Sequence, residues 1–171
     1  MKNQTIFHYE GSNLGITDSF KSDGQTQGIK LLSFKVVPAN EEMQQDLFLE
    51  KGDFVYEIKR LRLFDDHPFM IERGFIPIKI APELSQKVVS GSIFNYLEDV
   101  QNKVVTKSFM TMKVAPSNEE DQELLALKPT EPVAIMEGIF FLDDGTPFEV
   151  SNMRLRYDYF NYNTFVTLDE E

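Results

Sequence analysis

The sequence PANEEMQQDLFLEKGDFVYEIKRLRLFDDH, at residues 38–67, recurs 78 residues later as PSNEEDQELLALKPTEPVAIMEGIFFLDDG, at residues 116–145. Ten of the thirty aligned positions are identical, and one inserted residue, Thr146, then aligns Pro147-Phe148 with Pro68-Phe69. An ungapped match of this length indicates an internal duplication. Two copies are too few and too long for a solenoid, so the sequence predicts a pseudo-symmetric single domain.

Each copy predicts the same order of elements: a strand, a short helix, and a β-hairpin that turns at an acidic loop. The helices are predicted to begin after Asn40 and Asn118, whose side chains can accept from a free backbone N–H. Gly52 and Pro129 are predicted to stop them. The predicted strands are 30–37 and 54–64 in the first copy and 108–115 and 133–142 in the second.

Two further segments complete the expected fold. Residues 82–99 are predicted to be helical, with Ser92 as the N-cap of a helix over 93–100. Residues 160–168 are predicted to form a closing strand before the acidic end Asp169-Glu170-Glu171. The sequence therefore predicts an α+β fold in which helices flank an antiparallel sheet.

Composition narrows the possible functions of this chain of 171 residues. Without cysteine, it has no thiol chemistry and no cysteine-based zinc site, and its two distant histidines argue against a histidine metal centre. The net charge of −11 disfavours binding to nucleic acid or to an anionic membrane. No apolar run can span a bilayer, and the N-terminus has no signal-peptide core, so we expect a cytoplasmic protein.

The five arginines all lie in the two hairpin segments, at Arg60, Arg62, Arg73, Arg154 and Arg156. Residues two apart on a strand share a face, so the sequence contains two same-face arginine pairs that can converge on an anionic small molecule. A simpler interpretation makes them cross-strand partners of acidic residues. Glu72 and Glu149, on the return strands, can orient an arginine, bind a ligand hydroxyl, or be surface carboxylates.

The start of the helix at Ser92 is a second candidate anion site, because its free N–H groups and dipole favour negative charge. Plain N-capping is the commoner use of such a serine. No nucleophile, phosphate-loop, dinucleotide or metalloprotease motif is present. We therefore expect no catalytic residues, no metal and no cofactor.

Three motifs in order resemble the UTRA domain, the effector-binding domain of HutC-type bacterial transcription regulators in the GntR superfamily. They are VYEIKRLRLFDDHPFMIERGFIP at 55–77, SIFNYLE at 92–98, and GTPFEVSNMRLRYD at 145–158. The resemblance implies a chorismate-lyase-like fold over residues 14–168. Residues 1–13 are then a linker and residues 169–171 an acidic tail.

The resemblance also implies a ligand site for a small metabolite, often a phosphorylated sugar. In the sugar-phosphate binders of this family, the R-x-R strand and the serine-led helix hold the phosphate, and glutamates of the two return strands contact the sugar. Phe94 stands where the family often has tyrosine, and Arg154 and Leu155 stand where tyrosines often precede the closing arginine. The implied ligand-binding residues are Arg60, Arg62, Glu72, Ser92, Phe94, Glu149 and Arg156.

As a regulator domain, the chain is expected to form a homodimer, to bind a small-molecule effector, and to act on DNA only through a separate winged helix-turn-helix domain. No such DNA-binding domain is present in this sequence, so we expect part of a longer protein or a free-standing domain. The effector, its role as inducer or corepressor, and the controlled operon stay open.

Two other hypotheses stay open at this point. One is an enzyme on the same fold that acts on an aromatic or enol-ether acid such as chorismate, because fold does not determine function. The other is a dimerisation module that binds no ligand and uses its Phe-rich sheet as an interface.

Overall fold

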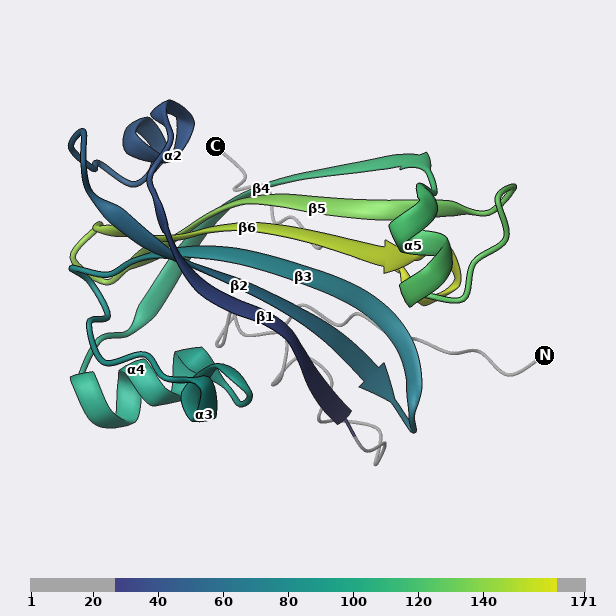
Figure 1. Cartoon of the computed structure of the whole chain (residues 1–171), viewed down its shortest axis with the longest axis horizontal. Coiled ribbons are helices and arrows are strands. Elements are labelled where there is room, and N and C mark those ends of the chain that lie inside the picture. Colours follow the sequence, from purple (N-terminus) through teal and green to yellow (C-terminus); the bar gives the residue numbers. More distant parts are fainter. Residues whose placement is uncertain (1–26, 163–171) are drawn as a thin grey trace, which may run out of the picture.

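The computed structural model describes residues 27–162, which form a six-stranded antiparallel sheet with helices on both faces (Figure 1). The strand order is β1-β2-β3-β6-β5-β4, with β3 and β6 in the centre. The predicted α+β fold is confirmed. The elements are β1 (Gln27–Pro38), α2 (Glu41–Asp46), β2 (Phe54–Phe64), β3 (His67–Pro77), α3 (Gln86–Val89), α4 (Ile93–Gln101), β4 (Val105–Pro116), α5 (Glu119–Leu124), β5 (Pro132–Leu142), β6 (Pro147–Arg156) and a 3-10 turn (Tyr157–Tyr159).

The duplication found in the sequence is visible in the architecture. β1, α2 and β2 begin 78 residues before β4, α5 and β5, respectively. Each copy supplies three adjacent strands, and the two copies meet where β3 pairs with β6. The predicted order of strand, helix and hairpin is therefore confirmed in both copies.

The two repeat helices begin as predicted but end earlier. Asn40 accepts from the backbone N–H of Met43, and Asn118 accepts from that of Asp121, so both N-caps are confirmed. The stops predicted at Gly52 and Pro129 are wrong, because α2 ends at Asp46 and α5 ends at Leu124.

The early helix ends have a packing cause. Phe48 and Ala126, at equivalent positions, adopt left-handed backbone with φ of 51° and 52°. Leu47 and Leu49 on either side of Phe48 are both buried. Residues two apart in a continuing helix point in different directions, so unwinding at Phe48 allows both leucines to reach the core. Burial of the leucines, which is a tertiary effect, determines where the helix stops.

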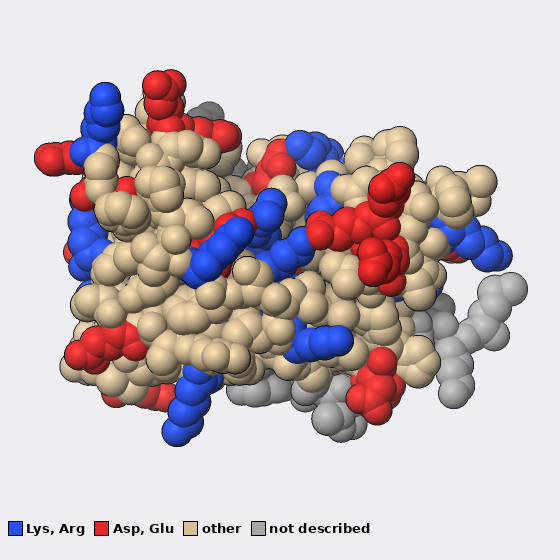
Figure 2. Space-filling model, in the orientation of Figure 1, with Lys and Arg blue, Asp and Glu red and all other residues tan. Residues whose placement is uncertain are grey.

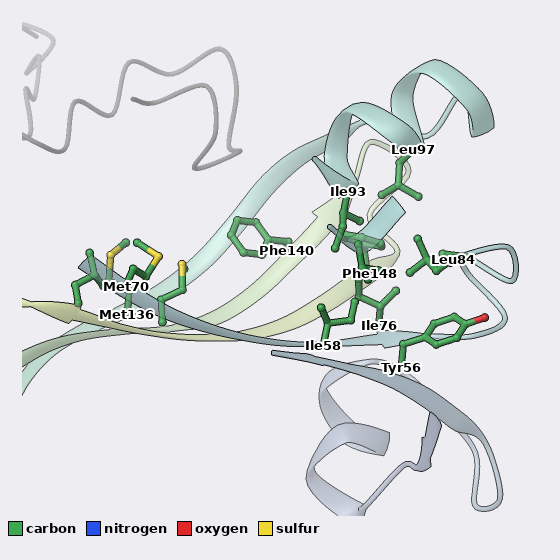
Figure 3. Packing of buried hydrophobic residues seen from close by; sticks show 14 of the residues in the cluster. Tyr56, Ile58, Met70, Ile76, Leu84, Ile93, Leu97, Met136, Phe140 and Phe148 are labelled. Atoms are coloured by element: carbon green, nitrogen blue, oxygen red, sulfur yellow. The ribbon is translucent and has the colours of Figure 1, made fainter. Parts of the chain in front are cut away.

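The helical segment predicted at 82–99 is divided into two helices, α3 and α4, separated by Ser90, Gly91 and Ser92. Ser92 caps α4 as predicted, and its Oγ accepts from the Asn95 N–H at 3.3 Å. In Figure 3, Ile93 and Leu97 of α4 point toward the sheet, where Phe148 is among the side chains they meet. The largest core cluster therefore lies between α3–α4 and one face of the sheet.

The other face carries α2 and α5, one toward each end of the sheet (Figure 1). Leu125 and Leu127, which follow α5, pack with Leu61 and Ile71 of the sheet. None of the helices within residues 27–162 is long and apolar enough to cross a bilayer. The closing strand predicted at 160–168 lies mostly outside the described residues, and its described part, 160–162, is not a strand.

Candidate functional site

Four charged side chains, Arg60, Arg62, Glu72 and Glu149, are buried on the sheet face that α3 and α4 cover. Arg60 and Arg62 are two residues apart on β2 and therefore share a face. Glu72 lies opposite Arg60 in the β2–β3 register. The register places this carboxylate beside both guanidinium groups, so the structure brings together four of the residues expected from the sequence.

Arg60 and Arg62 share one carboxylate oxygen. Nε of each arginine lies 2.9 Å from Glu72 Oε2, and Arg62 Nη2 lies 3.4 Å from Glu72 Oε1. Burial raises the pKa of Glu72, but the positive charges of the two arginines outweigh burial and hold the pKa at about 2. Glu72 is therefore ionised at neutral pH and balances one of the two guanidinium charges.

Arg60 also connects the cluster to the helices above it. Its Nη1 donates to the carbonyl of Val89 at 3.2 Å and to that of Gly91 at 2.9 Å. Val89 is the last residue of α3, where carbonyl groups lack partners within the helix. The Arg60 guanidinium therefore joins β2 and the carboxylate of Glu72 to the connection between α3 and α4.

Glu149, on β6, is 4% exposed and has no hydrogen-bond partner among residues 27–162. Its side chain lies over Gly74 of β3, where a Cβ atom would come within 2.3 Å of Glu149 Oε1. Burial raises the pKa of Glu149 to about 8, the negative charge of Glu72 acts in the same direction, and Arg60 and Arg62 oppose both. Glu149 is therefore mostly protonated at neutral pH.

Ser92 and Phe94 lie beside the cluster, at the start of α4. Ser92 follows Gly91, whose carbonyl accepts from Arg60. The ring of Phe94 packs edge-on against Phe140 and Phe148, with centroid distances of 5.2 and 5.9 Å. Within the described residues, neither Ser92 nor Phe94 hydrogen-bonds to the four charged side chains.

Arg156 lies apart from the other expected site residues. It donates to both carboxylate oxygens of Asp158 and to the carbonyl of Leu125, which follows α5. Arg154, two residues earlier, binds Asp121 of α5 through two hydrogen bonds of 2.7 and 2.6 Å. The second arginine pair thus lies on the α5 side of the sheet, so the two pairs do not converge.

The two guanidinium groups of the buried cluster are chemically suited to bind an anion. At neutral pH the described part of the cluster holds two guanidinium groups, one ionised carboxylate and one mostly protonated carboxyl group. The planar guanidinium group can bind a carboxylate or phosphate through two parallel hydrogen bonds. In the part of the chain that the structure describes, no group of three or more metal-ligating side chains is found.

Two residues at this site were missed by the sequence analysis. Gly74 provides the space that Glu149 occupies, and a glycine inside a predicted strand is a signal of such a close approach. Ser151, two residues after Glu149 on β6, is 2% exposed. An isolated serine in a strand carries no comparable signal, because its surroundings depend on strand pairing.

The opposite side of the sheet has a different character. Figure 2 shows Lys and Arg side chains next to Asp and Glu side chains across the middle of the face in view. Glu57, for example, pairs with Lys35 at 2.8 Å and with Arg73 at 2.9 Å. A cavity of about 350 Å³ beside α2 is lined by, among others, Glu42, Asp46 and Phe109. Lys35 and Arg73 are about half-exposed, unlike the buried arginines under α3 and α4.

Comparisons with known proteins agree with the fold. A family model described as the UTRA domain matches residues 22–161. The chain is similar to the HTH-type transcriptional regulator GmuR of Bacillus subtilis, with 30% identity over 147 residues, which cover 86% of this chain and 61% of GmuR.

Two further proteins to which the chain is similar are also transcription regulators. The mannosyl-D-glycerate transport/metabolism system repressor MngR of Escherichia coli is 28% identical over 133 residues, covering 78% of this chain and 55% of MngR. A crystal structure of a GntR-family transcriptional regulator from Bacillus cereus superposes with a TM-score of 0.72 at 27% identity, covering 82% of this chain and 99% of that one. This chain spans about three fifths of the length of the curated relatives it matches.

Proposed function

The chain belongs to the UTRA domain family, and from this premise we propose that it is the effector-binding domain of a bacterial transcription regulator of the GntR superfamily. The effector is a small anion that binds at Arg60 and Arg62. One observation carries this assignment: two buried arginines share a single ionised carboxylate, Glu72, beside a second carboxyl group that is mostly protonated.

The charge of the cluster supports an anionic effector. Hydrogen bonds between buried guanidinium groups and an anionic group are charge-assisted and strong, so two such groups side by side suit a bound anion. An anion held by Arg60 and Arg62 would take over hydrogen bonds that these residues now donate to Glu72 and to the carbonyls above. Binding would then reach α3 and α4 through Arg60, whose Nη1 contacts Val89 and Gly91.

A phosphorylated sugar is the favoured class of effector. Glu149 lies on the same sheet face as the arginines and can bond to a sugar hydroxyl. The name of MngR connects that relative to mannosyl-D-glycerate, which is a sugar derivative that carries an anionic group. Of the expected ligand-binding residues, we assign Arg60, Arg62, Glu72 and Glu149 to direct contact and Ser92 and Phe94 to the rim of the site. Arg156, on the α5 side, supports the fold.

In the whole regulator, the domain would control DNA binding by a separate winged helix-turn-helix domain, and it would do so as a homodimer. The relatives that it matches are named as transcription regulators, which favours this role over catalysis. The net charge of −11 agrees with DNA binding through another domain, because a DNA-binding surface needs clustered Lys and Arg.

A thermal-shift screen against sugar phosphates, free sugars and aromatic acids tests the proposal. A ligand present at about 100 times its Kd adds about 2.7 kcal/mol to the free energy of unfolding. For a domain of this size, that raises Tm by about 5–10 °C. We expect phosphorylated sugars to produce this shift, and Arg62→Gln to abolish it.

Arg73→Gln is the matched control, because Arg73 lies on the same sheet but is half-exposed and pairs with Glu57 on the other face. We expect the control to keep the full shift. Shifts with aromatic acids alone, or equal loss of the shift in both variants, would reject the assignment of the anion site.

A further inference from the structure

The strand β4 forms one edge of the sheet and is regular over most of its length. Among residues 27–162 it pairs only with β5 (Figure 1). No bulge interrupts the β4–β5 register from Lys107 to Pro116. A regular edge strand presents a row of N–H and C=O groups on its outer side, and these groups can pair with a strand of another chain.

Apolar side chains are exposed on both faces of β4. Phe109 and Thr111 line the cavity beside α2, so they lie on the α2 side of the sheet. Met112 and Val114 alternate with them and therefore lie on the side of α3 and α4. The exposed fraction is 68% for Phe109 and 70% for Val114. Large exposed apolar groups along a regular sheet edge indicate a surface that another chain covers.

The other edge strand, β1, is less suited to such pairing, although it is the repeat of β4. Its register with β2 shifts between Leu31 and Ser33, in the middle of the strand. A bulge twists an edge and hinders the addition of a further strand. The four residues 111–114 of β4 are all exposed, whereas two of their equivalents at 33–36 are partly buried. The open edge is therefore β4.

A second copy of the chain fits this edge, because a two-fold axis perpendicular to the sheet pairs a strand antiparallel with itself. Directly opposite residues share a face, so the axis must pass through a residue of the strand. An axis at Met110 would place Lys107 opposite Lys113 of the second copy, and like charges in these positions repel. An axis at Thr111 instead places Lys113 opposite Phe109, where the ammonium group can contact the aromatic ring.

We propose that β4 pairs antiparallel with β4 of a second copy, centred on Thr111, and joins the two six-stranded sheets into one continuous sheet. An axis at Met112 is less favourable, because the pairing would then extend to Pro116, which has no N–H to donate. The inference rests on the proposed function, which makes the domain a homodimer, and adds the interface and its register.

A single introduced cysteine tests the register, because the chain has no cysteine of its own. In the proposed dimer, Thr111 lies opposite itself at a Cα separation of about 4.5–5.5 Å. This separation is within the range of about 4.4–6.8 Å that a disulfide spans. We expect oxidised Thr111→Cys to run mainly as a covalent dimer on a non-reducing gel. Ser33→Cys, at the equivalent position of β1, is the matched control and should run as a monomer.

A charge test uses two substitutions of Phe109, whose exposed side chain makes both variants compatible with the fold. Phe109→Lys places a positive charge opposite Lys113 twice in each dimer, whereas Phe109→Glu places a negative charge there. Because both variants lose the ring, their difference isolates the effect of charge. From two cross-strand charge pairs we expect the dimer Kd of Phe109→Lys, measured by sedimentation equilibrium, to be about tenfold higher than that of Phe109→Glu.

The outcomes separate this inference from the homodimer itself. If the wild type is a dimer but Thr111→Cys cross-links no better than Ser33→Cys, the inference fails and the homodimer uses another surface. Equal dimer Kd values in the two Phe109 variants would overturn the register. A wild type that stays monomeric at the highest concentration measured would overturn both the inference and the homodimer, while the effector site would still be decided by the thermal-shift screen.

Discussion

Glu72 and Glu149 are both buried on one face of the sheet, and their pKa values shift in opposite directions. Glu72 lies between two guanidinium groups, whose charges hold its pKa at about 2 despite burial. Within residues 27–162 no cation hydrogen-bonds to Glu149, and burial raises its pKa to about 8. Two residues of the same type thus become an anion that orients the arginines and a neutral group that can donate a hydrogen bond.

This difference predicts how anion binding depends on pH. Between pH 7 and pH 9 the wild-type Glu149 loses its proton, which adds a negative charge beside the bound anion. Each pKa unit by which a bound anion raises the pKa of Glu149 corresponds to about a tenfold weaker affinity for the anion once Glu149 is ionised. We take a shift of about one unit as the expected size. We therefore expect the Kd of inorganic sulfate, whose charge is constant in this range, to rise about tenfold in the wild type. Glu149→Gln, which cannot ionise, should show less than a twofold change when titrated calorimetrically at both pH values, and an equal rise in the variant would assign the effect to another group.

Part of this site could be predicted from the sequence alone. The spacing of Arg60 and Arg62 was enough to predict that they share a face, because strand alternation is a local property. That both would bind Glu72, and that Arg154 and Arg156 would lie on the other side, depended on the register of strands that are distant in the sequence. Ser151 was missed for the same reason, because its neighbours Gly74 and Gly138 lie on two other strands that are distant in the sequence.

The starts of α2 and α5 have a local cause in the sequence, whereas their ends are determined by packing. The starts at Asn40 and Asn118 depend on one side chain and a backbone N–H three residues later, so the local sequence was sufficient to predict them. The ends depend on burying leucines on both sides of Phe48 and Ala126, which neither Gly52 nor Pro129 reveals. Elements were therefore predictable where their cause is local.

The contact between β3 and β6 at Gly74 gives a prediction about strand packing. In Gly74→Ala, the new Cβ would lie 2.3 Å from Glu149 Oε1, so the Glu149 side chain must move from its place beside the arginines. We expect this variant to bind glucose 6-phosphate at least about fivefold more weakly, the effect of one lost hydrogen bond.

Gly28→Ala is the matched control, because a Cβ at Gly28 of β1 would meet only Leu63 at an ordinary distance of 3.6 Å. The control should keep wild-type affinity and stability within the range of ordinary surface substitutions, about 0.5 kcal/mol. Calorimetric titration and urea unfolding measure both quantities. Wild-type affinity in Gly74→Ala would show that the position of Glu149 does not matter for binding.

The molecule combines a symmetric backbone with an asymmetric site. The two copies place equivalent strands at equivalent positions, and the sequence repeat was sufficient to predict this arrangement. At the positions of β5 equivalent to Arg60 and Arg62, however, the second copy has Gly138 and Phe140. The first copy therefore supplies both arginines, Glu72 and Gly74, while the second copy supplies Glu149 and the apolar side chains around it.

The two buried carboxyl groups also determine how the stability of the whole domain depends on pH. The pKa of Glu72 is lower in the folded state, about 2, than its ordinary value of 4.5, so its contribution is complete above pH 4.5 and is lost as the pH falls toward 2. The pKa of Glu149 is higher in the folded state, about 8. Its contribution is therefore complete below pH 4.5 and is lost as the pH rises to 8, because only the unfolded chain ionises readily in that interval.

The variant Glu149→Gln isolates the contribution of Glu149 to the pH dependence of stability. The free energy of unfolding of the variant, minus that of the wild type, should increase from pH 5 to pH 8 with a slope approaching about 1.4 kcal/mol per pH unit, and should level off above pH 9. Urea unfolding at each pH measures this difference, and Glu50→Gln, at an exposed position, should give a difference that stays near zero. A difference that is constant with pH would mean that Glu149 is ionised in the folded domain. The site would then lack its neutral hydrogen-bond donor, and the effector would have to be bound by the arginines and by hydroxyl groups alone.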